Sequence, residues 1–108
     1  MNVIRRLVLD ILKPHEPSIT DFAEETNQIQ GVEGVNATLV EIDEEVQNIK
    51  LTIEGEEIVE SEIREKIENL GGSIHSIDQI VCGDKMVEEI HTHHKTNVRK
   101  TQRELAKR

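Results

Sequence analysis

The sequence predicts one α+β domain in which two helices cover one face of a four-stranded antiparallel sheet. Hydrophobic periodicity gives the element order strand, helix, strand, strand, helix, strand. The only aromatic residue is one Phe, so the core must consist of Ile, Val and Leu. At 108 residues, the chain has room for a single core.

The first expected element is a strand over residues 3–12. Leu7, Leu9 and Ile11 alternate on one face, while Val8 and Leu12 make the other face partly apolar. Apolar residues on both faces are typical of a central strand. The two prolines within residues 13–17 lack the N–H that a sheet needs, so we expect the strand to stop there.

A helix should follow from Ser18. This residue is a typical N-cap, and Asp21 stands three positions later, where the acid of a capping box lies. The next residues form one apolar stripe at helical spacing: Ile19, Phe22, Ala23, Thr26 and Ile29. Gly31 is expected to end this helix.

Residues 35–42 and 46–54 are predicted to form a hairpin. The first segment is rich in β-branched residues, and the second alternates Ile and Leu with polar residues. The polar residues 43–45 form the turn, and residues 55–57 (Gly-Glu-Glu) are expected to break the second strand.

The second helix is predicted over residues 58–70, with Gly71 and Gly72 ending it. The last strand is expected over residues 73–82. Its apolar residues do not keep one alternation, which predicts a β-bulge.

This order is that of the ferredoxin-like, split βαβ fold. Right-handed crossovers place both helices on one face of the sheet. Numbered along the chain, the strands should lie in the order 4-1-3-2, with the first and third strands central. We expect residues 1–90 to form this domain, and residues 91–108 to form a basic, His-containing tail that is helical or disordered.

Charge separates the body from the tail. Residues 1–90 carry 7 Lys and Arg against 21 Asp and Glu, whereas residues 91–108 carry 6 against 1. The acidic body would repel nucleic acid, and the chain lacks the aromatic side chains on which bases stack. Nucleic acid is therefore not expected as a partner.

A cytoplasmic location is expected. No apolar run reaches the length of about 18 residues that a membrane span needs. Asp10 interrupts the apolar N-terminal segment, and no small-residue cleavage site follows it. Cys82 is the single cysteine, so no intrachain disulfide can form.

The face of the sheet without helices is the first candidate site. It should carry the polar alternation of the strands, and its candidate ligand-binding residues are Arg6, Asp10, Lys50, His75 and Asp78. Such a face can serve as an oligomer interface, a small-molecule platform or plain solvated surface, and all three readings stay open.

The second candidate is a metal site at the start of the tail, formed by Glu88, Glu89, His91, His93 and His94. Imidazole and carboxylate together suit zinc, nickel or copper. The alternative is a soluble His-rich tail without a dedicated metal, since the spacing matches no closed zinc site. Acidic runs at residues 41–45 and 54–57 could hold a hard cation, although they lack the spacing of an EF-hand loop. The only cofactor that these residues suggest is a divalent cation.

Enzymatic activity is not favoured. His75 with Asp78 or Asp10 could form a general-base pair. However, the sequence offers no nucleophile with an orienting base and no Gly-rich phosphate loop.

Four segments carry a resemblance to a known family: residues 4–17, 31–36, 53–55 and 71–78. Over about residues 3–88 the chain resembles a family of small archaeal proteins of unknown function. The resemblance implies a ferredoxin-like fold, an archaeal source and a homo-oligomer of higher order, for which a ring is one form. It implies no activity and no functional residue.

Our leading hypothesis is a non-enzymatic, self-assembling domain that binds a small ligand or ion in a regulatory role. The alternative is a divalent-metal-handling protein that uses the histidines of the tail.

Overall fold

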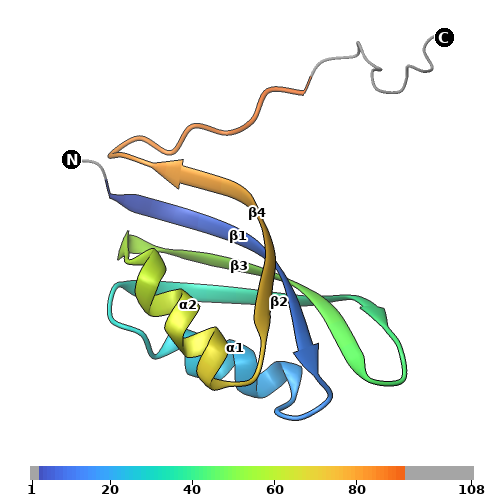
Figure 1. Cartoon of the computed structure of the whole chain (residues 1–108). Coiled ribbons are helices and arrows are strands. Elements are labelled where there is room, and N and C mark those ends of the chain that lie inside the picture. Colours follow the sequence, from blue (N-terminus) through green and yellow to red (C-terminus); the bar gives the residue numbers. More distant parts are fainter. Residues whose placement is uncertain (1–2, 92–108) are drawn as a thin grey trace, which may run out of the picture.

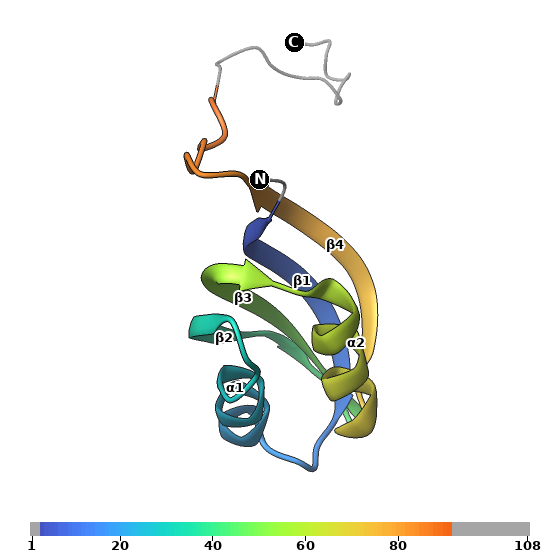
Figure 2. The same ribbon diagram turned by 90° about the vertical axis from the view of Figure 1, so that its left-hand side faces the viewer.

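The computed structural model describes residues 3–91 and has the predicted element order (Figure 1). Its elements are β1 (Ile4–Pro14), α1 (Ile19–Asn27), β2 (Val32–Ile42), β3 (Val46–Ile58), α2 (Glu60–Asn69) and β4 (Ser73–Cys82). The strands form one antiparallel sheet in the order β2-β3-β1-β4, and the two helices lie on one face of it (Figure 2). The ferredoxin-like fold and the central positions of β1 and β3 are confirmed. No helix in this part of the chain is long and apolar enough to cross a membrane.

The core lies between the sheet and the helices. Three aliphatic residues of β1 and three of β3 are fully buried there, together with Phe22, Ile63 and Ile67 from the helices. The strand residues are Leu7, Leu9, Ile11, Ile49, Leu51 and Ile53. The period-two alternation of β1 and β3 therefore points their aliphatic side chains at the helices.

The Ser18 cap is confirmed, because its hydroxyl accepts a hydrogen bond from the amide of Asp21 at 3.1 Å. α1 ends at Asn27 rather than close to Gly31. Gly31 has a positive φ of 94° and lies in the connection to β2.

The prediction for the end of β3 was wrong. Residues 55–57 do not break the strand, which continues to Ile58, and Ile58 is a core residue of β3 rather than the first residue of the helix. The reason is a close backbone approach: a Cβ added at Gly55 would lie 1.9 Å from the carbonyl oxygen of Gly31. Glycine is needed here for packing and not for a turn.

β4 contains the expected bulge, and in fact two. Between Ile74 and Ile80, the pairing with β1 shifts twice, and each shift leaves one extra residue in β4, first His75 and then Asp78. As a result, Ile74, Ile77 and Ile80 pair with Ile11, Leu9 and Leu7. Isoleucines three residues apart therefore share the helix face of a strand, which regular alternation would not allow.

Lys13 is an unexpected member of the interior. β1 runs on through Pro14, so the fully buried side chain of Lys13 lies on the core side of the sheet. Its Nζ donates to the Pro14 carbonyl at 2.6 Å and to Oε1 of Gln47 at 3.0 Å, and it lies 5.2 Å from the centre of the Phe22 ring. Burial lowers the pKa of Lys13 below its usual value, and the negative charges of Glu16 and Asp21 only partly oppose this.

Replacing the single aromatic residue should be costly. Phe22→Ala removes a fully buried ring between the helices and the sheet, and it is expected to lower the free energy of unfolding by about 3–5 kcal/mol. Urea denaturation measures this loss. Thr20→Ala, an exposed change in the same helix, is the control, and an equal effect of both substitutions would contradict this description of the core.

Lys13 should give stability a specific pH dependence. Its pKa in the folded protein is below the usual 10.5 of the unfolded chain, so the unfolded state holds more protons as the pH approaches that value. The free energy of unfolding should therefore rise with pH in this range. Lys13→Met removes the contribution of Lys13 to this pH dependence. Urea denaturation between about pH 8 and 10 compares the two proteins, and equal pH slopes would refute the assignment.

Candidate functional site

The bare face of the sheet is built by the other alternation of β1 and β3. Arg6 pairs with Glu54, Val8 with Thr52, and Asp10 with Lys50. Because paired residues of antiparallel strands point to the same side, these residues form two parallel rows on the face opposite the helices. The open face therefore carries the polar residues that the alternation predicted.

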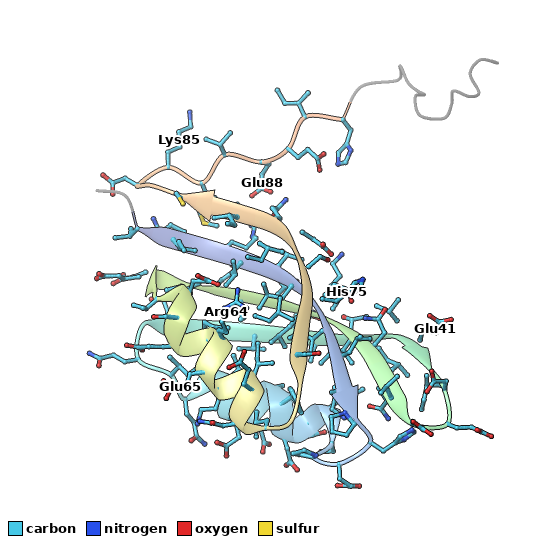
Figure 3. The ribbon with its side chains drawn as sticks, viewed as in Figure 1. Glu41, Arg64, Glu65, His75, Lys85 and Glu88 are labelled. Atoms are coloured by element: carbon cyan, nitrogen blue, oxygen red, sulfur yellow. The ribbon has the colours of Figure 1, made fainter. Side chains whose placement is uncertain are left out.

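Arg6 is the most constrained side chain on this face. Its Nε donates to Oε2 of Glu54 at 2.6 Å, and its Nη1 donates to Oε1 of Glu88 at 2.9 Å and to Oε1 of Gln79 at 3.3 Å. The hydrogen bonds to Glu88 and Glu54 raise the pKa of Arg6, and the bond to Arg6 lowers the pKa of Glu88. Figure 3 shows Glu88 lying between the segment after β4 and the sheet.

A shallow hollow lies beside Arg6 on the bare face. Its lining consists of Arg6, Val8, Lys50, Thr52, Glu54, Asp78, Gln79 and Glu89. Three predicted ligand-binding residues therefore line one hollow: Arg6, Lys50 and Asp78. Of these, Lys50 is exposed and forms no ion pair within residues 3–91.

The other two predicted residues lie outside this hollow. Asp10 faces the same side but accepts a hydrogen bond from Nδ2 of Asn48. His75 is an exposed bulge residue of β4 (Figure 3). Within residues 3–91, His75 has no hydrogen bond to Asp78 or Asp10, and Asp78 instead accepts from the hydroxyl of Ser76 at 2.6 Å.

The charges around the hollow decide what it can attract. Arg6 is already paired with two carboxylates, which offset its positive charge and weaken its attraction for an anion. Lys50 is the other cation, whereas Glu54, Asp78, Glu88 and Glu89 bring four carboxylates. The arrangement favours a cationic ligand over an anionic one.

The predicted metal ligands are only partly within the described residues. His93 and His94 lie outside them. Nε2 of His91 lies 3.9 Å from Oε1 of Glu89, and Glu88 is bonded to Arg6. Residues 3–91 contain no group of three or more His, Cys, Asp or Glu residues that is placed to hold a metal ion.

The acidic turn of the β2–β3 hairpin has a structural explanation. The carboxylate of Asp43 accepts from the amides of Val46 at 2.8 Å and Glu45 at 2.9 Å, and these bonds lower the pKa of Asp43. His15 contacts the carbonyl of Asp43 at 2.9 Å. The acid therefore closes the turn.

Two exposed apolar groups lie at opposite edges of the sheet. The first, the hairpin patch, consists of Leu39, Val40, Ile42 and Val46 near the end of the β2–β3 hairpin. The second, the β4 patch, consists of Ile77 and Ile80 on the helix side of β4. These side chains are 38–59% exposed, although their strand partners include core residues.

Residues 5–96 match the DUF211 family, described as an uncharacterized ArCR family. The chain belongs to the DUF211 family. It is also 56% identical over 92 residues to the uncharacterized protein MJ0319 of the archaeon Methanocaldococcus jannaschii, a match that covers 85% of this chain and 95% of that protein. The expected resemblance to an archaeal family of unknown function is confirmed.

Sequence reasoning about this DUF211 protein missed the partners of Arg6. The alternation of β3 placed Glu54 on the polar face, and this could have identified Glu54 as a partner of Arg6. Glu88 lies 82 residues from Arg6 along the chain, and no periodicity connects the two.

The pKa of Glu88 should report the contact with Arg6. In Arg6→Gln, the hydrogen bond that lowers the Glu88 pKa is lost, so this pKa should rise toward its usual value of 4.5. Carbon-detected NMR titration of the side-chain carboxyl measures the change. Lys50→Gln removes a cation from the same face without touching Glu88, and an equal shift in that variant would argue against the direct contact.

Proposed function

We propose that this DUF211 protein is a non-enzymatic, self-assembling domain whose copies associate side to side and bind a small ligand or ion in a regulatory role. The observation that carries the proposal is the pair of apolar groups, the hairpin patch and the β4 patch, at opposite edges of one sheet. Exposed apolar side chains gathered in this way are typical of protein interfaces.

The two patches differ in composition, so the proposed contact is head to tail: the β4 side of one copy meets the β2–β3 side of the next. Such heterologous contacts close into a ring when the rotation between copies allows it. A ring-shaped homo-oligomer is therefore the assembly that we propose.

Side-chain packing, rather than continuation of the sheet, should form the contact. β4 has two bulges, and β2 has an extra residue at Val40 relative to β3. Bulges on edge strands hinder the addition of another strand. Burial of Ile77 and Ile80 against a neighbour would remove their apolar surface from water, which stabilises association.

The ligand part of the proposal rests on the hollow beside Arg6. Its excess of carboxylates, its half-buried Thr52 and its exposed Lys50 suit a small cation or an amine that also accepts a hydrogen bond. In an assembly, residues of a neighbouring copy could complete this shallow site. A divalent metal bound with the help of the tail histidines is the alternative occupant.

Native mass spectrometry of the full-length protein tests both parts, because it reports the number of subunits and any retained molecule or ion. We expect a homo-oligomer of more than two copies. A monomer that persists as the concentration is raised would refute self-assembly. A stable oligomer without any retained or added cation would refute the ligand part alone.

The β4 patch supplies a directed variant. Ile77→Asp with Ile80→Asp should dissociate the oligomer, because two carboxylates would have to be desolvated in the contact. Light scattering measures the molar mass. Ser61→Asp, an exposed change on α2, should leave the mass unchanged, and an oligomer that survives the β4 substitutions would contradict the assigned surface.

A further inference from the structure

The segment after β4 is an extended arm held at its base. The arm consists of residues 84–91, which form neither helix nor strand (Figure 1). At its start, Gly83 turns the chain with a φ of 101° and donates to the Val3 carbonyl at 2.9 Å. Nη1 of Arg5 donates to the Asp84 carbonyl at 3.3 Å, and Arg6 holds Glu88. Side chains of β1 therefore hold the arm at Asp84 and at Glu88.

The distal part of the arm carries two uncovered apolar side chains. Val87 is 66% exposed and Ile90 84% exposed, the highest values among the exposed large hydrophobic residues of the described chain. Neither side chain belongs to the core cluster. An extended segment that is anchored at its base and carries free apolar side chains is a form in which proteins bind a groove or patch on a partner.

The hairpin patch of the same chain is out of reach. Glu88 is held at Arg6, near the start of β1, whereas the hairpin patch includes Val46, which pairs with Pro14 at the end of β1. Pro14 lies eight residue steps along the strand from Arg6, a distance of about 26 Å. Ile90 lies only two residues beyond Glu88, which adds roughly 7 Å of reach. A contact between Ile90 and a hairpin patch therefore requires a second copy.

Charge complementarity favours the hairpin patch as the binding surface of the arm. The hairpin patch is flanked by Glu41, Asp43, Glu44 and Glu45. The residues that begin at the end of the arm, 91–108, carry 6 Lys and Arg against 1 Glu. Seating Ile90 on the hairpin patch of another copy would bring this basic segment to its acidic turn.

We propose that the arm of one copy binds the hairpin patch of a neighbouring copy, with Val87 and Ile90 as its apolar anchors. The inference rests on the proposed self-assembly and names the contact that locks it. The arm leaves from the β4 side and the hairpin patch lies on the β2–β3 side, so the polarity agrees with head-to-tail association.

Disulfide trapping in the full-length protein tests the contact. In a Cys82→Ser background, which removes the only cysteine, Ile90→Cys is combined with Val40→Cys. Mild oxidation should link position 90 of one chain to position 40 of another, as identified by peptide mass spectrometry. The control combines Ile90→Cys with Thr20→Cys on the exposed side of α1, where cross-linking should be at background level.

A second variant measures the contribution of the anchors. Val87→Asp with Ile90→Asp should raise the dissociation constant of the assembly at least about tenfold, while circular dichroism shows an unchanged fold. An intact oligomer with unaltered affinity in this variant, and no 90–40 disulfide, would overturn the role of the arm and leave self-assembly standing. A monomeric unmodified protein would overturn the proposed function itself.

Discussion

The helices of this molecule are much shorter than its strands, and this difference determines how much of the sheet the helices cover. α1 and α2 have 9 and 10 residues, so each is about 15 Å long, whereas β3 has 13 residues and extends over about 43 Å. The helices can cover only the middle of the sheet, where Leu9, Leu51 and Phe22 are fully buried. Beyond them along the strands, Leu39 and Ile42 keep the apolar character of core positions and stay exposed. Ile77 and Ile80 are exposed as well, but they lie beside Leu9 and Leu7 on the edge strand β4. The hairpin patch therefore follows from the difference in length, and the β4 patch from the position of β4 at the edge of the sheet.

Most of the fold could be predicted from the sequence because most of its elements depend on residues that are close to one another along the chain. The alternation of β3, the Ser18 cap and the irregular isoleucine spacing of β4 each involve residues that are neighbours in sequence. The prediction of where β3 ends was wrong because that end depends on a contact between residues far apart in the sequence. Gly55 reads as a strand breaker, and only its approach to the backbone of Gly31 reveals it as a packing residue.

The candidate site was less predictable for the same physical reason. Alternation placed Arg6, Lys50 and their neighbours on one face, which requires only the parity of each strand. The state of Arg6 depends on Glu54 and Glu88, which lie 48 and 82 residues away. Two carboxylates change Arg6 from a candidate ligand-binding residue into a fixed link between β1, β3 and the arm. Side-chain reach, rather than residue type, decides this outcome.

The same link connects the bare face with the proposed assembly. Glu88 is bonded to Arg6 and lies in the arm between Val87 and Ile90, so a cation bound in the hollow would compete for a carboxylate that positions those anchors. Because equilibrium coupling is reciprocal, an assembly that fixes the arm must change cation affinity by the factor with which the cation changes assembly. A ligand-sensitive oligomer therefore requires no moving domain in this small fold. It requires only that Glu88 contribute to both equilibria.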